Sequence, residues 1–137
     1  MRSMSEQPSQ PTRRVDGKPR VVVTRRLMPS VEARMEELFE TTLNPDDAPL
    51  SREALVEAMR DADVLVPTVT DRIDATMLEQ AGPRIGLIAS FGAGTDHIDL
   101  KAAAGRKIIV TNTPGVFTDD TADIAMAGII GVPRRIR

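Results

Sequence analysis

Residues 85–99 read IGLIASFGAGTDHID, and this stretch contains the pattern that decides the fold. The apolar run Ile85–Ala89 predicts a buried strand. A loop with Gly92 and Gly94 follows and leads toward a short helix predicted from Asp99 to Ala104. A glycine-rich loop that leaves a strand and opens a helix presents backbone N–H groups to an anion. The stretch therefore predicts a strand, a loop that could hold a carboxylate or a phosphate, and a helix, although a tight turn that needs glycine fits the same spacing.

Short apolar runs alternate with helical patterns on both sides of this stretch. The predicted strands are Val21–Val23, a weaker one near Thr41–Leu43, Val64–Val66, Ile85–Ala89 and Ile108–Val110. Caps predict helices at Pro29–Ser30, Ser51, Asp74 and Thr118, the first with the apolar face Val31, Met35, Leu38 and Phe39. This alternation predicts an α/β fold, a flavodoxin-like doubly wound parallel sheet. Pro67–Asp71 and Phe91–Asp96 would then face each other beyond the carboxyl ends of two strands.

Length and composition restrict the class of protein. The chain of 137 residues can form one domain, and it has a net charge of −2, which argues against nucleic acid as a partner. It has no cysteine, which is compatible with a cytoplasmic protein, and no apolar run long enough to span a bilayer. Residues 1–19 are rich in Ser, Gln and Pro and are expected to form a disordered tail.

The glycine loop does not match a dinucleotide-binding fingerprint. Gly92 and Gly94 fit G-x-G-x-x-G, but His97 takes the third position, and no acidic residue follows the next strand. His97 is the only histidine, and we interpret it as a capping or packing residue. Five aspartates near predicted helix starts complement helix dipoles, so no metal site is predicted; they are Asp96, Asp99, Asp119, Asp120 and Asp123.

The last predicted helix is apolar on nearly every side. It follows Thr118 and runs to Val132, with Pro133 directly after it. A helix of this kind is expected to be buried all round. We therefore expect it to need a further domain or a partner, and expect the chain alone to self-associate.

Several segments together resemble the D-isomer-specific 2-hydroxyacid dehydrogenases, particularly the glyoxylate and hydroxypyruvate reductase branch. The segments are Val23–Leu27, Val66–Asp74, Phe91–Asp99, Val110–Gly115 and Thr118–Asp123. The resemblance runs from about Arg20 to the end of the chain. It implies a substrate-binding domain over residues 20–117, then a truncated interdomain-type helix over 118–137 that would lead into a missing Rossmann domain.

The resemblance also implies roles for particular residues. The substrate carboxylate of the family rests on amides that match Gly92, Ala93 and Gly94, and a loop that matches Val69 and Thr70 lines the same cleft. The position that matches Thr121 faces the nicotinamide. The substrate would be a small 2-keto or 2-hydroxy acid, weakly bound, and the cofactor NAD or NADP. The catalytic arginine, glutamate and histidine of the family have no counterpart, so no catalytic residue is assigned and the chain alone is expected to be catalytically silent.

Two other functions fit parts of the sequence. A non-catalytic interaction module would pair through the apolar last helix, with itself or with an intact homologue. A phospho-acceptor receiver domain has similar length, but it needs acidic residues after the first and third strands. Those positions hold Thr24–Arg26 and Pro67, so we discard the receiver interpretation.

Overall fold

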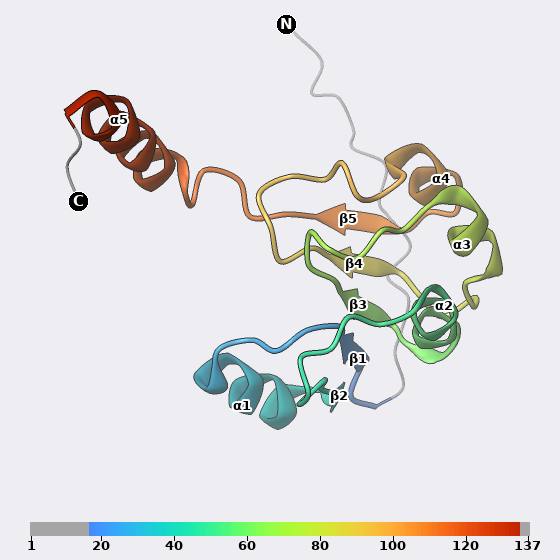
Figure 1. The fold of residues 1–137 in the computed structure, drawn as a ribbon. Helices are drawn as coiled ribbons and strands as arrows, with labels where there is room; N and C mark the ends of the chain where they lie inside the picture. The colour runs from blue at the N-terminus through green and yellow to red at the C-terminus, as the bar shows by residue number, and fades with distance from the viewer. Residues whose placement is uncertain (1–16, 135–137) are drawn as a thin grey trace, which may run out of the picture.

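The computed structural model describes residues 17–134, which form a five-stranded sheet with five helices (Figure 1). The predicted tail lies almost wholly outside the described residues. The strands are β1 (Arg20–Val23), β2 (Glu40–Thr42), β3 (Val64–Val66), β4 (Leu87–Ala89) and β5 (Ile109–Thr111). The helices are α1 (Pro29–Leu38), α2 (Arg52–Asp61), α3 (Ala75–Gln80), α4 (Leu100–Gly105) and α5 (Thr118–Arg134).

All four neighbouring strand pairs are parallel, in the order β2-β1-β3-β4-β5. This is the strand order of flavodoxin-like folds, as the alternation of strands and helices predicts. The carboxyl ends of the strands meet along one edge of the sheet. The loops that follow β1, β3 and β4 therefore lie near one another, and they build the candidate site.

The helices divide unequally between the two faces of the sheet. Residues of α2, α3 and α4 pack in one large cluster whose centre holds Leu65 and Ile88, both fully buried. On the opposite face, Val21 and Val23 of β1 pack against residues of α1. The α1 face prediction is correct for three positions, because Val31, Met35 and Phe39 pack there, but wrong for Leu38, which is 44% exposed.

Local side-chain chemistry fixes most helix starts. Ser51 accepts a hydrogen bond from the Ala54 amide and Asp74 accepts one from the Met77 amide, so these two predicted caps are confirmed. Asp99, predicted as the first residue of a helix, is the cap of α4 and accepts from the Ala102 amide. The predicted cap at Pro29–Ser30 is wrong, because Met28 precedes α1 with no capping bond and Pro29 is its first residue. Proline there needs no N–H partner and already has the helical φ.

The helix α5 projects away from the sheet (Figure 1). It begins at Thr118, and its residues from Thr118 to Ile130 are exposed. The expectation of an apolar helix is confirmed, but within residues 17–134 nothing buries it. The helix also continues through Pro133, where the sequence suggested an end. No helix among the described residues is long and apolar enough to cross a membrane.

Candidate functional site

Two loops at the carboxyl edge of the sheet are fastened to each other at two points. At the first, the Phe91 amide donates to Pro67 O at 2.8 Å beside a Thr68–Phe91 bridge. At the second, the Ile73 amide donates to His97 O at 2.8 Å. The segments between these points form the two sides of a cleft. The prediction that the two loops face each other is confirmed.

Between the two fastening points, Val69 packs directly against Gly92. A Cβ placed on Gly92 would lie 2.5 Å from Cγ1 of Val69, so only glycine permits this approach. The carbonyl of Gly92 accepts from the Thr113 amide at 2.9 Å, and that of Ala93 accepts from Asn112 Nδ2 at 2.7 Å. These two bonds occupy the carbonyl groups of Gly92 and Ala93.

The amides of the loop remain available. Within residues 17–134, the N–H groups of Ala93 and Gly94 donate to no protein acceptor, and both residues are exposed. Exposed neighbouring N–H groups of this kind can bind one carboxylate. The structure therefore brings together four of the predicted substrate-binding residues, Val69, Gly92, Ala93 and Gly94, and Thr70 lines the same cleft.

The glycine loop does not open a helix. The helix α4 starts at Leu100, well after Gly94, and the Asp99 carboxylate already caps it. This corrects the expectation that a helix start adds to the anion site. A dinucleotide pyrophosphate binds where a glycine turn meets a helix N-terminus. The glycine loop does not provide that arrangement.

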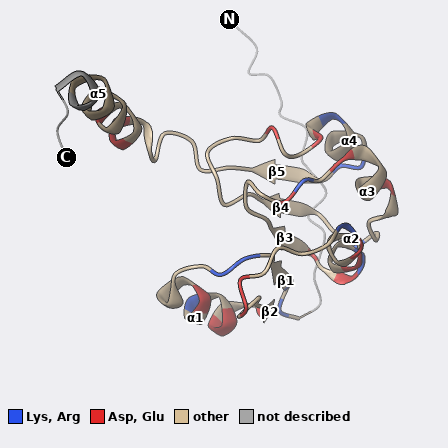
Figure 2. Ribbon diagram, in the orientation of Figure 1, with Lys and Arg blue, Asp and Glu red and all other residues tan. Residues whose placement is uncertain are grey.

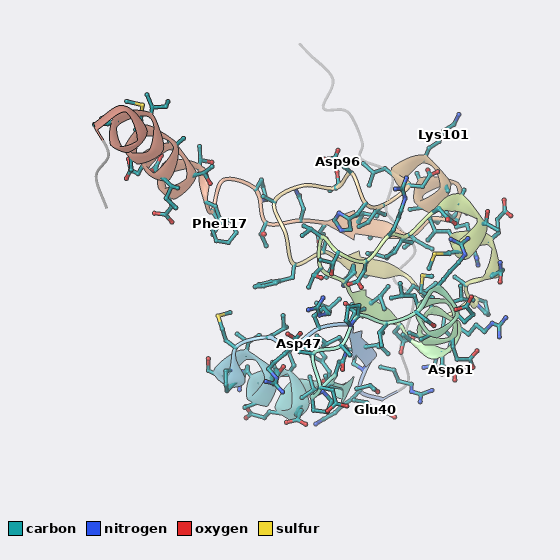
Figure 3. The ribbon with its side chains drawn as sticks, in the orientation of Figure 1. Glu40, Asp47, Asp61, Asp96, Lys101 and Phe117 are labelled. Atoms are coloured by element: carbon teal, nitrogen blue, oxygen red, sulfur yellow. The ribbon has the colours of Figure 1, made fainter. Side chains whose placement is uncertain are left out.

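The cleft has a volume of about 460 Å³ and is lined by Val69, Thr70, Arg72, Gly94, Asp96 and His97. Asp96 projects from the loop between β4 and α4 (Figure 3). Its position corrects the interpretation that all five aspartates stand at helix starts, because Asp96 precedes the cap of α4. Asp123 lies beyond the first turn of α5, where the dipole effect has faded. No group of three metal-binding side chains occurs in the described part of the chain.

Arg25 reaches the cleft from the end of β1, and sequence analysis missed it. Its Nη1 donates to Thr70 Oγ1 at 3.2 Å, and its Nε donates to Asp47 Oδ1 at 3.0 Å. Asp47 belongs to the segment between β2 and α2 (Figure 3). The Arg25 side chain holds the pKa of the Asp47 carboxyl below its usual range. In Figure 2 the segment that contains Arg25 is the blue stretch that leaves β1.

His97 lies half-buried in the cleft wall. Its Nε2 is 3.1 Å from Oγ of the buried Ser90. Burial lowers the pKa of His97, and the carboxylates of Asp71 and Asp96 oppose that shift. The contact with Ser90 is compatible with the interpretation of His97 as a packing residue. The position of His97 in the cleft was not predicted, because no sequence pattern links His97 to Ser90.

Thr121 lies in the first part of α5, away from the cleft (Figure 1). Its amide donates to Phe117 O at 2.9 Å, and Phe117 marks the point where the chain turns into the helix (Figure 3). The structure does not bring Thr121 to the other predicted residues. Its contact with a nicotinamide stays a prediction.

The fold and the cleft define a class: α/β proteins with a parallel sheet and a cleft at its carboxyl edge, where exposed amides could hold a small anion. The profile of the family "D-isomer specific 2-hydroxyacid dehydrogenase, catalytic domain" matches residues 21–128. The chain belongs to this family.

Particular relatives agree with that membership. A glyoxylate reductase from Korarchaeum cryptofilum is 44% identical over 119 residues, which are 87% of this chain and 36% of the relative. A protein structure from Thermus thermophilus superposes with a TM-score of 0.74 at 39% identity and covers 85% of this chain and 37% of its own. An NADPH-dependent glyoxylate/hydroxypyruvate reductase from Sinorhizobium meliloti, solved with NADP and malonate, has a TM-score of 0.66 at 30% identity, covering 84% and 34%. The chain thus spans little more than a third of the length of these relatives.

Proposed function

We propose that residues 20–117 bind the substrate of an NAD(P)-dependent 2-keto acid reductase that acts on glyoxylate or hydroxypyruvate. The observation that carries the proposal is the pair of amides at Ala93 and Gly94, which have no acceptor within residues 17–134 and lie beside the Val69–Gly92 contact. The Sinorhizobium meliloti reductase, which holds the dicarboxylate malonate, supports a carboxylate as the bound group. The hydride would come from NAD(P)H held by a cofactor part that these residues do not supply.

The expected affinity is low. Hydrogen bonds from two amides to a charged carboxylate contribute about 1.5–3 kcal/mol each. The loss of translational freedom on binding offsets much of this gain. We therefore expect a Kd of about 1 mM or weaker for a small 2-keto acid.

Titration of the ¹⁵N-labelled chain with oxamate, an unreactive 2-keto acid analogue, tests the proposal. We expect saturable shifts of the Ala93 and Gly94 amide signals, and small shifts at α2, which lies away from the cleft. Acetamide, which has no carboxylate, is the matched control. If oxamate and acetamide give the same shifts, the carboxylate site is wrong.

Catalysis is a separate part of the proposal. The pure chain should not oxidise NADPH with glyoxylate, because it offers neither a dinucleotide site nor an assigned proton donor. Addition of the cofactor-binding part of the Sinorhizobium meliloti reductase should restore some turnover if the two parts associate. NADPH oxidation by the chain alone would contradict this expectation.

The second candidate function is pairing through α5. Among the residues of this helix up to Ile130, four large apolar side chains are more than half exposed: Ile124, Met126, Ile129 and Ile130. Between Thr118 and Ile130 the charged residues of the helix are Asp119, Asp120 and Asp123, and Figure 2 shows acidic residues in red near its start. Burial of such side chains against a second copy would contribute about 25 cal/mol per Å².

Sedimentation tests this pairing. We expect the chain to form dimers or larger species that Ile124→Glu and Ile129→Glu together convert to monomer. Lys101→Glu on the exposed face of α4 is the control for added negative charge. A monodisperse wild-type monomer at high concentration would contradict the pairing.

A further inference from the structure

A buried carboxylate lies directly beneath the turn that carries Val69 and Thr70. Asp71 is 3% exposed, and its Oδ2 accepts from Thr24 Oγ1 at 2.5 Å. The same oxygen accepts from the Thr68 amide at 2.8 Å and from Thr68 Oγ1 at 3.3 Å. Three donors therefore converge on one carboxylate oxygen that is almost out of contact with water.

These bonds connect the turn to a different strand. Thr24 is fully buried and follows β1, whereas Thr68 and Asp71 follow β3. The Asp71 amide also donates back to Thr68 O at 3.1 Å, which closes the turn. Charge-assisted hydrogen bonds in a region with little water are strong and directional. These hydrogen bonds therefore fix the position of the turn relative to the end of β1.

The position of this turn sets the shape of the cleft. Val69 and Thr70 are the two residues between Thr68 and Asp71, and both are exposed at the cleft. Val69 and Gly92 are in close contact, because a Cβ added at Gly92 would clash with the Val69 side chain. A turn released from Thr24 would let Val69 move relative to the amides that follow Gly92.

We propose that Asp71 is a positioning residue of the carboxylate site, which it serves through Thr24 and Thr68 without touching the ligand. This inference rests on the proposed function, since it assigns Asp71 to the same cleft. It predicts that the affinity for a carboxylate depends on a hydrogen bond buried beneath the cleft.

The test compares Thr24→Val, which removes the donor at nearly constant volume, with Thr24→Ser, which keeps it. Oxamate titration of the full chain, followed at the Ala93 and Gly94 amides, gives the Kd of each variant. We expect Thr24→Val to raise the Kd at least fivefold and Thr24→Ser to stay within twofold of wild type. We also expect Thr24→Val to speed hydrogen exchange of the Thr68 amide at least tenfold.

A control separates positioning from general stability. Val56→Ala truncates a buried side chain of α2 away from the cleft and should lower Tm without changing the Kd. A wild-type Kd in Thr24→Val, or an equal rise in Val56→Ala, would overturn the positioning role. If wild type itself shows no saturable shift, the proposed function fails instead, and the exchange rate of the Thr68 amide still decides whether Thr24 and Asp71 hold the turn.

Discussion

Substitution of Gly92 by alanine is expected to damage the cleft more than the fold. The new Cβ would lie 2.5 Å from Val69 Cγ1, whereas carbon atoms in contact prefer at least about 3.5 Å. Val69 must therefore move by about 1 Å or more. Overpacking costs about 1–3 kcal/mol, and because Val69 is 57% exposed and can turn outward, we expect about 1 kcal/mol. Thermal unfolding should show a fall in Tm of roughly 4 °C.

The same movement should weaken oxamate binding by about tenfold, because about 1.4 kcal/mol is lost when one amide bond is misaligned. Gly105→Ala at the end of α4 is the matched control, since its Cβ would meet nothing within 4 Å and Gly105 is not among the residues that line the cleft. Val69→Ala in the Gly92→Ala background should recover part of the lost stability. Equal effects of Gly92→Ala and Gly105→Ala on both Tm and Kd would refute the reasoning.

Three further predictions concern stability and protonation. Gly82→Ala should prevent folding or lower Tm by more than about 10 °C, which circular dichroism can measure, because its Cβ would overlap the backbone oxygen of Arg60. The side chain of Arg52 lowers the pKa of Asp74 from 3.8 to about 2. The folded state thus binds the proton of this carboxyl more weakly than the unfolded chain does. The stabilisation of the folded state should therefore disappear as pH falls from about 4 to 2 in wild type but not in Asp74→Asn. Burial lowers the pKa of His97 below 6.5, so the unfolded chain binds this proton more tightly and stability should fall as pH drops below 6.5, whereas an NMR titration that gives a pKa above 6.5 would contradict this.

Local patterns in the sequence predicted the order and type of every strand and helix. Short β-branched runs and side-chain caps such as Ser51 and Asp74 act within a few residues, so they can be recognised without the fold. The strand bounds shifted by one or two residues, since β4 starts at Leu87 and β5 at Ile109. Pairing with a neighbouring strand, which no local pattern encodes, decides where each strand begins.

The cleft was predictable only in part. The glycine loop can be recognised from the sequence, because Gly92 and Gly94 closely follow a predicted strand. The contacts of Arg25 with Thr70 and of Thr24 with Asp71 join residues more than forty positions apart. Only the topology that places β1 next to β3 brings these side chains together. Sequence patterns therefore could not predict these polar contacts at the cleft.

The register of the sheet shows which sheet face is left partly uncovered within residues 17–134, where the helix α5 is uncovered as well. Val21, Val64, Leu87 and Ile109 share one register, so they point to the face that α1 covers. Among the described residues no helix covers this face over β4 and β5, and Ile109 is 48% exposed, although its neighbour Ile108 is 4% exposed. Parallel sheets are normally covered on both faces. A helix that directly followed β5 and packed back would fill this place, but α5 projects away from it (Figure 1). Within residues 17–134 the two apolar surfaces thus have the same physical cause, which is that α5 does not pack back onto the sheet.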